Sequence, residues 1–346
     1  MKNIKDYDVK DKRVLVRCDF DVPMDSNGNI LDDFRIKQDL PTIKYLMEAK
    51  AKVILIGHAG RPNGKVVESL RLIPIQKKLT EYLGIEVNKP LDCIGRDIEK
   101  LVEKMKSGEV LLLENVRFHK GETENNEEFA KKLAKLGDIY VNNAFANSHR
   151  AHASMTKICK YLPSVAGFTL KKEIEVLNNL IKNPEKPLVV IIGGAKVEET
   201  KLKLINRFSE IAAEIIIGGL VKKEVIEKKI KLKNPKKILG PIGNLSALDI
   251  NNESINLFRE KILVAKTILW NGPFGKFEDD NYKRGTLEIA NAIIESGAFS
   301  VVGGGQTIEF LDKENIISKF SYVSTGGGAM LSYLAGDILP GLKALE

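Results

Sequence analysis

Short apolar segments alternate with amphipathic segments along almost the whole chain, and this alternation limits the possible folds more than any other feature. The apolar segments are rich in Val, Ile and Leu on both faces, as are strands of a parallel sheet covered by helices. We expect strands at residues 13–18, 53–56, 110–113, 139–141, 188–192, 214–217, 237–239, 267–270, 300–302 and 322–324. Strands that alternate with helices predict an α/β fold built on doubly wound parallel sheets.

The length of 346 residues and a break in the series of strands indicate two domains. No strand is expected between residues 159 and 187, where residues 170–181 predict a long amphipathic helix that ends at Asn183-Pro184. We therefore expect two Rossmann-like domains joined by this hinge helix. The expected boundaries are 1–158 for the N-terminal domain, 159–186 for the hinge and interdomain helix, 187–338 for the C-terminal domain, and 339–346 for a tail that returns to the N-terminal domain.

Composition excludes several classes of protein. Hydrophobic residues make up 43% and charged residues 29%, which is typical of a folded globular chain and not of a disordered one. No apolar segment approaches the about 20 residues of a membrane-spanning helix, and residues 1–13 lack the apolar stretch of a secretory signal. Cys18, Cys93 and Cys159 have no CxxC spacing, so we expect neither a disulfide framework nor a zinc site, and we expect a cytoplasmic location.

The formal net charge of +8 allows either a nucleic acid or an acidic small molecule as the partner. Most of the excess is lysine scattered along helical segments such as residues 100–106 and 222–237, which indicates a solvated surface. Aromatic residues make up only 6% and do not interleave with basic runs as in a protein that binds single strands. We therefore expect small-molecule substrates, with no nucleic acid and no membrane as partners.

Arginine and glycine are distributed unevenly along the chain. Most of the arginines and all four histidines lie within the first 152 residues, whereas most of the glycines follow residue 151. This indicates two anion sites of different construction, one made of guanidinium groups and the other of backbone amides at glycine turns. On composition alone, the alternative remains that arginine is clumped by chance and that glycine only marks turns.

Charged loops follow four successive strands of the first half. These loops contain Asp19 and Asp21, then His58 and Arg61, then Arg117 and His119, and finally Ser148-His149-Arg150-Ala151-His152. Because ligands of doubly wound sheets bind beyond the carboxyl ends of the strands, the loops predict one convergent anion site. For each loop taken alone, a solvated surface turn remains the alternative. Asp19 and Asp21 would either pair with the arginines or accept hydrogen bonds from substrate hydroxyls.

Glycine-rich turns follow the strands of the second half. They are Gly193-Gly194-Ala195-Lys196, Gly218-Gly219, Asn271-Gly272-Pro273, Gly303-Gly304-Gly305 and Gly326-Gly327-Gly328. Such turns let the backbone approach a phosphate closely, and the N-terminus of a following helix attracts the anion. Together they predict a polyphosphate site. The sequence has no GxxxxGK[ST] motif and no GxGxxG in its first βαβ unit, which disfavours a P-loop NTPase and an ordinary dinucleotide-binding dehydrogenase.

These loops resemble those of the phosphoglycerate kinase family. The matching segments are RCDFDVP, GHAGRP, LLLENVRFHKGE, YVNNAFANSHRAHAS, IIGGAKV, LWNGPFGKFE, VVGGGQT, VSTGGGA and LPGLKAL, in the family's order. The resemblance implies a hinge-bending kinase of glycolysis and gluconeogenesis that transfers a phosphoryl group between 1,3-bisphosphoglycerate and ADP, giving 3-phosphoglycerate and ATP. It also implies Mg²⁺ carried by the nucleotide and in-line transfer after domain closure. We expect a monomer.

The resemblance assigns functional residues position by position. The substrate-binding residues are Asp19, Phe20, Asp21, Arg35, His58, Arg61, Arg117 and Arg150. The nucleotide-binding residues are Gly194, Lys196, Thr200, Gly218, Gly219, Leu248, Asn271, Pro273, Glu278, Gly304, Gly305, Gln306 and Thr307, with Glu278 on the ribose hydroxyls. The catalytic residues are Arg35, Lys196, Gly327 and Gly328, which would neutralise the transferred phosphoryl group by charge and by fixed dipoles. No protein ligand to the metal is assigned, although Gln306 would lie near it.

Four positions depart from the residues that the family usually has. Asp21 stands where the family usually has Asn, and Asn143 stands where it usually has Asp. Thr200 stands where many members have a second lysine, and Lys201 comes directly after it. Gln306 stands where many members have Asp, and it cannot offer a carboxylate to Mg²⁺.

The chain is also shorter than is usual for the family, with residues 220–248 compressed. In the family this segment walls the adenine pocket, so the choice of nucleotide stays open. Two alternative functions also remain. One is an enzyme of this fold that acts on another phospho-acid or nucleotide, and the other is a non-catalytic relative that kept the sites.

Overall fold

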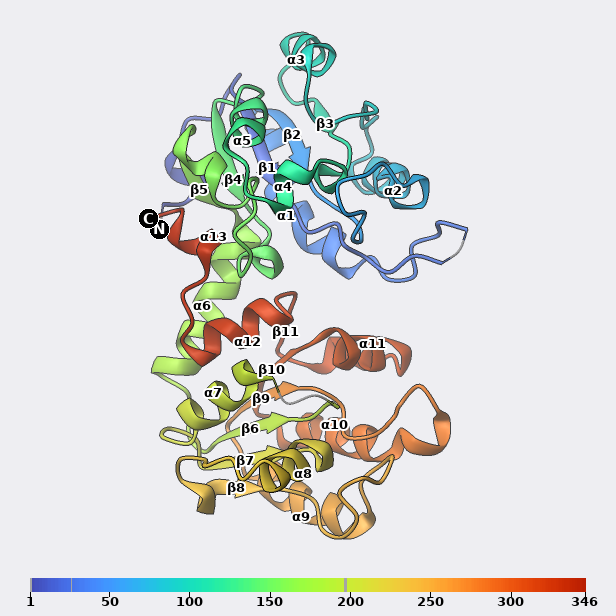
Figure 1. The fold of residues 1–346 in the computed structure, drawn as a ribbon, viewed down its shortest axis with the longest axis vertical. Helices are drawn as coiled ribbons and strands as arrows, with labels where there is room; N and C mark the ends of the chain where they lie inside the picture. The colour runs from blue at the N-terminus through green and yellow to red at the C-terminus, as the bar shows by residue number, and fades with distance from the viewer. Residues whose placement is uncertain (1, 26, 196–197) are drawn as a thin grey trace. The chain divides into compact units, whose positions relative to one another are not determined.

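The computed structural model describes residues 2–25, 27–195 and 198–346, and the chain divides into two compact units (Figure 1). The first unit holds Met1–Glu175 together with Ile338–Glu346, and the second holds Val176–Asp337. The division falls inside helix α6 (Phe168–Lys182). Each unit contains one sheet in which all the paired strands are parallel.

The sheet of the first unit has the strand order β3-β2-β1-β4-β5. Its strands are β1 (Arg13–Arg17), β2 (Lys52–Ile56), β3 (Val110–Leu112), β4 (Ile139–Asn142) and β5 (Ser164–Ala166). Nearly every strand residue is buried, which is why the residues between the strand ends are apolar and do not alternate with polar ones. The chain builds β1 to β3 on one side and then crosses to the other side of β1 for β4 and β5.

Helices link and flank these strands in Figure 1. They are α1 (Phe34–Glu48), α2 (Ile73–Leu83), α3 (Arg96–Glu103), α4 (Lys120–Thr123), α5 (Glu127–Ala134) and, at the end of the chain, α13 (Pro340–Lys343). Helix α1 buries Ile36, Ile43 and Leu46 in the core that the sheet forms. Helix α13 is tied to the first unit because the amide of Gly341 donates to the backbone oxygen of Ser148 at 2.9 Å.

The sheet of the second unit has the strand order β11-β10-β9-β6-β7-β8. Its strands are β6 (Leu188–Ile192), β7 (Glu214–Ile217), β8 (Ile238–Leu239), β9 (Thr267–Asn271), β10 (Phe299–Gly303) and β11 (Tyr322–Ser324). Its helices are α7 (Glu199–Phe208), α8 (Gly219–Glu227), α9 (Asn252–Leu263), α10 (Arg284–Ser296), α11 (Gly305–Lys313) and α12 (Gly328–Ala335). Trp270, Phe258 and Phe310 are the largest buried side chains of its core.

The fold class expected from the sequence is confirmed, and each expected strand is present within one residue at either end. The expectation that no strand lies between residues 159 and 187 is wrong. Strand β5 lies there and pairs with β4, with Val141 opposite Val165. This strand has only three residues and sits at the edge of its sheet, so its pairing with β4 defines it more than its composition does.

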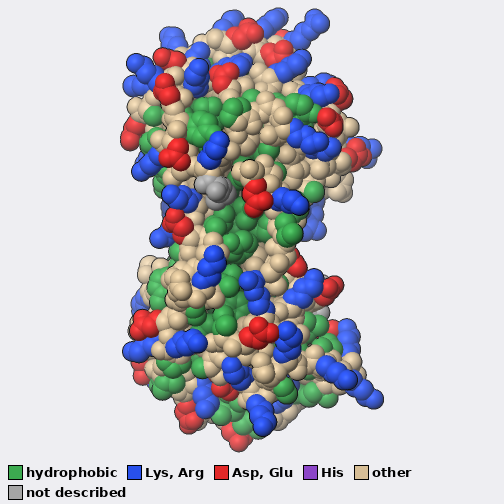
Figure 2. Space-filling model, turned by 90° about the vertical axis from the view of Figure 1, so that its left-hand side faces the viewer, with side chains coloured by type: hydrophobic (Ala, Val, Ile, Leu, Met, Phe, Trp, Pro, Cys, Tyr) green, Lys and Arg blue, Asp and Glu red, His purple; other side chains and the backbone are tan. Residues whose placement is uncertain are grey.

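The surface agrees with the expectation that basic side chains are scattered over a solvated surface. On the face that Figure 2 shows, Lys and Arg side chains are scattered among Asp and Glu side chains over both units. Within the described ranges, none of the helices combines the length and the apolar character that crossing a bilayer requires.

Candidate functional site

Each sheet reverses its direction of growth at one pair of neighbouring strands. In the first unit this switch point lies between β1 and β4, and in the second it lies between β6 and β9. Ligands of doubly wound sheets bind at such a point, outside the carboxyl ends of the strands. Each unit therefore has one candidate site of its own.

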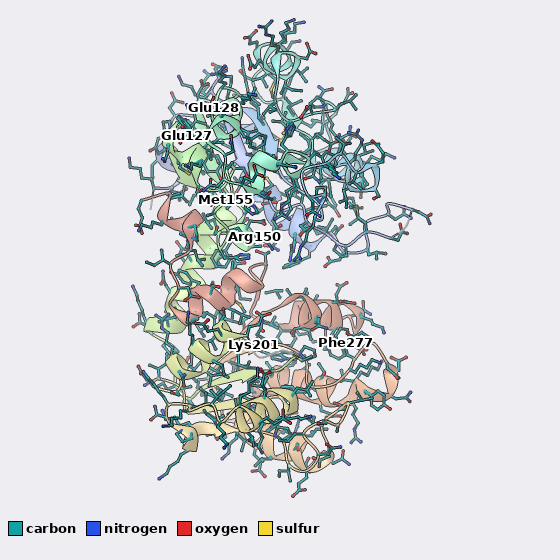
Figure 3. All side chains as sticks on the ribbon, viewed as in Figure 1. Glu127, Glu128, Arg150, Met155, Lys201 and Phe277 are labelled. Carbon is teal, nitrogen blue, oxygen red and sulfur yellow. The ribbon has the colours of Figure 1, made fainter. Side chains whose placement is uncertain are left out.

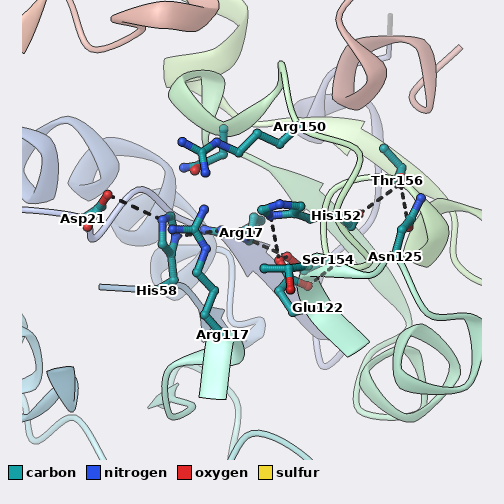
Figure 4. A network of polar contacts seen from close by, with 12 residues as sticks. Arg17, Asp21, His58, Arg117, Glu122, Asn125, Arg150, His152, Ser154 and Thr156 are labelled. Carbon is teal, nitrogen blue, oxygen red and sulfur yellow. Dashed lines mark hydrogen bonds and ion pairs between the residues drawn. The ribbon is translucent and has the colours of Figure 1, made fainter. Parts of the chain in front are cut away.

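A buried polar network lies beyond the carboxyl end of β1 (Figure 4). Arg17, the last residue of β1, is fully buried; its Nε donates to the Ser154 hydroxyl at 3.0 Å, and its Nη2 lies 3.0 Å from His58 Nδ1. Because a guanidinium group can only donate, His58 Nδ1 accepts and the ring carries its proton on Nε2. Nε2 lies 3.6 Å from Oδ2 of Asp21. Ser154 in turn donates to Oε1 of Glu122 at 2.6 Å.

The loop after β1 holds two carboxylates beside Arg35. Asp21 Oδ1 accepts the amide of Gly60 at 2.8 Å, which joins this loop to the loop after β2. Arg35, near the start of α1, donates from Nη1 to the backbone oxygen of Asp21 at 3.0 Å and lies 3.2 Å from Asp19 Oδ2. Oδ1 of Asp19 accepts the side-chain amide of Asn147 at 3.3 Å. Loops from three strands thus fix the position of these acidic side chains.

Several buried polar atoms at this edge have no hydrogen-bond partner among the described residues. Arg117 donates from Nη1 to the backbone oxygen of Gly60 at 2.9 Å, but its Nε and Nη2 are buried without a hydrogen-bond partner among the described residues. Nδ1 of His149 and Nδ1 of His152 are also buried without a hydrogen-bond partner in the described ranges. Arg150 comes from a different loop, and in Figure 4 its guanidinium group lies on the same side as that of Arg117. Unpaired buried donors are costly, and an anion that accepts from them removes that cost.

The environment sets the charge of each group at this edge. Burial lowers the pKa of His58 to about 3, and the nearby Arg17 opposes its protonation further, so the ring is neutral at pH 7. Burial alone would raise the pKa of Asp21, but the hydrogen bond from His58 and a backbone amide outweigh it and hold this pKa well below its usual range. Burial, together with neighbouring guanidinium groups, lowers the pKa of Arg117 to about 10, which leaves it cationic.

The buried neutral His58 predicts a specific dependence of stability on pH. Its pKa rises from about 3 in the folded chain to 6.5 on unfolding, so the unfolded chain binds the extra proton. The contribution of neutral His58 to the free energy of unfolding is therefore fully present above pH 6.5. This contribution is lost as the pH drops from 6.5 toward 3, by about 1.4 kcal/mol per pH unit for one proton. Urea unfolding at pH 7, 6 and 5 should show a smaller loss in His58→Gln. Equal losses in both proteins would contradict this assignment.

Two of the expected substrate-binding side chains are not in the network. Arg61 is exposed, and no contact of its side chain is found among the described residues. Phe20 is fully buried in the core, where its ring fills the space beside Gly57: a Cβ added to Gly57 would lie 2.4 Å from the ring. Phe20 can therefore meet a ligand only through its backbone.

The second unit has a pocket of about 630 Å³ at its switch point. Its lining includes seven of the expected nucleotide-binding residues, namely Gly194, Gly218, Gly219, Leu248, Pro273, Glu278 and Gln306. Leu220, Ile242 and Leu248 add partly exposed apolar surface to the same lining, with exposed fractions of 40%, 39% and 49%. A pocket with an apolar wall and glycine turns fits a planar base attached to phosphates.

The turns after β6 and β9 touch each other, and this contact explains their glycines. The amide of Gly194 donates to the backbone oxygen of Pro273 at 2.8 Å. A Cβ added to Gly193 would lie 2.4 Å from the backbone oxygen of Gly272, so no side chain fits at position 193. Two of the expected residues support these turns. Asn271 donates to the backbone oxygen of Gly303 at 2.9 Å, and the buried Thr307 hydroxyl accepts the amide of Gly272 at 2.9 Å.

The remaining expected residues of the second unit lie at helix starts. Gly304 precedes the first residue of α11, Gly305, and Gly327 precedes the first residue of α12, Gly328. Gly304 has φ +102° and Gly327 has φ +47°, backbone conformations that residues other than glycine rarely adopt. Both helices therefore begin at glycine turns, as expected for anion binding by helix N-termini.

The lysines after the first glycine turn differ from the expectation. Lys196 lies outside the described residues. Thr200 is half-buried on α7. The next residue, Lys201, instead reaches back to the turn, where its Nζ donates to the backbone oxygen of Gly193 at 3.0 Å, and its side chain is only 9% exposed. Figure 3 shows Lys201 within the second unit, and burial lowers the pKa of its ammonium group.

The chain was compared with protein families and with solved structures. The family model described as phosphoglycerate kinase matches residues 4–233 and 220–337. The chain belongs to the phosphoglycerate kinase family. The phosphoglycerate kinase of Dictyoglomus turgidum is 44% identical over 393 aligned positions, which cover 99% of this chain and 98% of that protein. That of Pelotomaculum thermopropionicum is 40% identical over 388 positions, with 99% and 98% covered.

Solved phosphoglycerate kinases agree with this assignment. The crystal structure from Pyrococcus horikoshii has a TM-score of 0.88 and 32% identity, and it covers 100% of this chain and 98% of that chain. The structure from Coxiella burnetii has a TM-score of 0.82 and 34% identity, with 99% and 98% covered. The family and the class of enzyme expected from the sequence, a kinase that is a phosphotransferase, are confirmed.

The alignment with the Dictyoglomus protein spans 393 positions, more than the 346 residues of the chain, so the relative holds residues that this chain lacks. The two matches to the family model overlap at residues 220–233, a segment that runs through α8 and contributes Leu220 to the pocket.

Sequence reasoning did not assign several residues that the structure brings to the two sites. In the first unit these are Arg17, Glu122, Asn147 and Ser154, and in the second it is Lys201. Arg17 could have been found, because a charged residue at the end of an otherwise apolar strand must be paired if it is buried. Lys201 lies one position after Thr200, which is where the spacing of the family would place a lysine.

Proposed function

We propose that this chain catalyses reversible phosphoryl transfer between 1,3-bisphosphoglycerate and ADP, giving 3-phosphoglycerate and ATP. One observation carries the proposal for the substrate: the buried Nε and Nη2 of Arg117 have no hydrogen-bond partner within the described part of the chain, and they lie beside Arg150 and the buried Arg17. A phosphate supplies several acceptor oxygens and the negative charge that such a site lacks. The glycine-lined pocket of the second unit supports a nucleotide as the other substrate.

We assign the substrate-binding residues accordingly. Arg117 and Arg150 bind the 3-phosphate, with Arg61 closing on it from the exposed loop after β2. Asp19 and Asp21 accept hydrogen bonds from the hydroxyl of the glycerate, and neutral His58 holds Asp21 in place through its Nε2–H. Asp21 carries a charge where the family usually has a neutral Asn. The neighbouring arginines, including Arg35, offset this charge.

The nucleotide is assigned to the pocket of the second unit. The base lies against the apolar wall that includes Leu248, the ribose hydroxyls bind Glu278, and the phosphates lie on the glycine turns, where Lys201 contacts Gly193. The role of Lys196 in binding the phosphates rests on the family resemblance. Gln306 Nε2 donates to Glu278 Oε1 at 3.3 Å, which positions this carboxylate. Gly304, Gly305, Gly327 and Gly328 offer amides at helix starts.

Mg²⁺ fits this pocket when the nucleotide carries it. Glu278 and Gln306 are among the oxygen-bearing side chains that line the pocket, and Gln306 offers a neutral amide oxygen. Among the described residues, a group of three side chains of metal-ligating type occurs only at Asp92, Cys93 and His119 in the first unit. The phosphates and water therefore supply most of the ligands. Bound in this way, the ion would neutralise charge on the phosphates.

The reaction requires no general base, because the acceptor is a carboxylate in one direction and a phosphate oxygen in the other. Catalysis then consists of positioning and of neutralising charge on the transferred group. Arg35 is the guanidinium closest to the reacting carboxyl in this assignment, and the lysines and helix starts act from the nucleotide side. Domain closure, which the family resemblance implies, remains a prediction.

A turnover assay tests the proposal directly. Formation of ADP from ATP should require 3-phosphoglycerate and Mg²⁺. Other phospho-acids of similar size should not replace 3-phosphoglycerate. A panel of nucleoside triphosphates tests the choice of base, which the shortened wall of the pocket leaves open. Turnover with another phospho-acid but not with 3-phosphoglycerate would overturn the proposed substrate, and binding of both ligands without turnover would indicate a non-catalytic relative.

Arg117→Ala should weaken 3-phosphoglycerate binding and leave ATP binding unchanged. Removing a buried charged donor from an anion costs about 2 kcal/mol, so the dissociation constant should rise about thirtyfold. Arg61→Ala serves as the comparison, because an exposed arginine without contacts contributes less. Titration calorimetry with each ligand checks this. Equal losses of affinity for both ligands in Arg117→Ala would contradict two separate sites.

A further inference from the structure

Helix α1 carries a buried carboxyl group that the proposed mechanism does not use. Asp39 is 1% exposed. Its Oδ2 accepts the backbone amide of Asp19 at 2.9 Å, so it contacts the first residue of the substrate loop directly. An acid in such a position is expected only where it is paired or hydrogen-bonded.

The other oxygen of Asp39 faces Asn143, one of the positions at which this chain departs from its family. Asn143 Nδ2 donates to Asp39 Oδ1 at 2.5 Å. The side-chain oxygen of Asn143 accepts from the Thr42 hydroxyl at 2.9 Å and from the amide of Thr169 at 3.1 Å. These two donors fix which way the amide of Asn143 points, so its nitrogen must face Asp39. Both oxygens of Asp39 therefore accept a hydrogen bond.

The charges around Asp39 show why its partner is an amide. Asp19 is the nearest acid, and burial together with Asp19 raises the pKa of Asp39 to about 8, whereas Asn143 and Arg17 favour the ionised form. An aspartate at position 143 would place a second carboxylate at hydrogen-bond distance from Asp39. Two carboxylates that close cannot both be ionised.

We propose that Asp39 is a positioning residue for the substrate site and that it acts as a pair with Asn143, which stands where the family usually has an acid. The pair fixes the backbone of Asp19. Asp19 in turn pairs with Arg35 at 3.2 Å, so the position of this backbone also sets the position of the guanidinium group. This inference rests on the proposed function only for the identity of the ligand.

A charge-swap series tests the inference in the full-length chain. In Asp39→Asn the new NH₂ group faces the NH₂ of Asn143, and in Asn143→Asp two carboxylates meet. Each single variant should raise the KM for 3-phosphoglycerate about tenfold, the loss of about one hydrogen bond, and leave the KM for ATP unchanged. The double variant Asp39→Asn with Asn143→Asp restores a donor opposite an acceptor and should return to within about threefold of the parent.

Thr42→Val is the matched control. It removes a donor to the same Asn143 amide but leaves the contact between Asp39 and Asp19. Its melting temperature should fall while its KM for 3-phosphoglycerate stays at the parent value. The inference is overturned if Thr42→Val raises this KM as much as Asp39→Asn does, or if the double variant is no better than Asn143→Asp. The comparison of the double variant with Asn143→Asp remains valid even if Asp39→Asn alone fails to fold.

Calorimetry with 3-phosphoglycerate separates this inference from the proposed function. If the parent chain does not bind 3-phosphoglycerate, the proposed function fails. If the parent binds it and the three variants at positions 39 and 143 bind it equally well, the positioning role of Asp39 fails while the proposed function stands.

Discussion

Arg35→Ala should reduce the turnover number by about a hundredfold to a thousandfold, which corresponds to 2.7–4 kcal/mol of lost transition-state stabilisation. Nη1 of Arg35 donates to the backbone oxygen of Asp21 and lies 3.2 Å from Asp19. Among the described residues, no partner is found for its Nε or Nη2, and the side chain is 31% exposed. A guanidinium group anchored at one nitrogen can direct the others at charge that develops on the transferred phosphoryl group.

Steady-state kinetics in the direction of ATP consumption measure this effect, with calorimetry for 3-phosphoglycerate binding. Affinity should fall far less than turnover, because Arg117 and Arg150 still hold the 3-phosphate. Lys37→Ala is the control on the same helix, since Lys37 is exposed, pairs with Asp33 at 2.7 Å and lies over the ring of Tyr82, away from the substrate loop. Its kinetics should match those of the parent. A variant of Arg35 with a normal turnover number and only a raised KM would refute the transition-state role.

The architecture could be predicted from sequence because parallel strands buried on both faces leave a clear apolar signal. Leu188–Ile192 is apolar throughout, and the structure buries all of it. Strand β5 could not be predicted in this way. Ser164 is polar, the strand has only three residues, and its place is set by pairing with β4 and by a bridge between Ala166 and Asn3. Such contacts join distant parts of the chain and leave no local pattern.

The first site could be predicted only as a set of loops. The sequence indicates that arginines meet at one sheet edge, but it gives Arg61 and Arg117 equal weight. The structure separates them, because Arg117 is buried with unpaired donors and Arg61 is exposed. Asp39 was not predicted at all. A single polar residue in an amphipathic helix is usually solvated, and only the packing of α1 against the loop after β1 buries it.

The second site shows how one position along a helix changes an assignment. Successive residues of an α-helix point about 100° apart, so Thr200 and Lys201 cannot face the same turn. Family spacing favours position 200 for a phosphate-binding lysine. Helix α7 begins at Glu199, and in this register Lys201 is the residue whose ammonium reaches Gly193. Spacing counted in sequence cannot detect such a shift.

Lys201→Met should therefore lower the turnover number by about a hundredfold, the scale for one charged donor in a water-excluded site. Nζ of Lys201 lies 3.0 Å from the backbone oxygen of Gly193 and would be 3.1 Å from a Cβ at Gly194, at the glycine turn that lines the pocket. Burial lowers the pKa of this ammonium, because its charge is poorly solvated there. Methionine keeps most of the volume and removes the charge.

Two neighbours on α7 provide the controls, and steady-state kinetics with varied ATP measure all three variants. Lys203→Met removes a lysine that is 48% exposed and pairs with Glu199 and Asp337, so its kinetics should stay near those of the parent. Thr200→Val tests the position favoured by family spacing and should change turnover less than about threefold. If Thr200→Val proved as damaging as Lys201→Met, the phosphate would contact position 200 and the register argued for Lys201 would be wrong. If Lys201→Met retained full turnover, its ammonium would serve only to hold the backbone oxygen of Gly193.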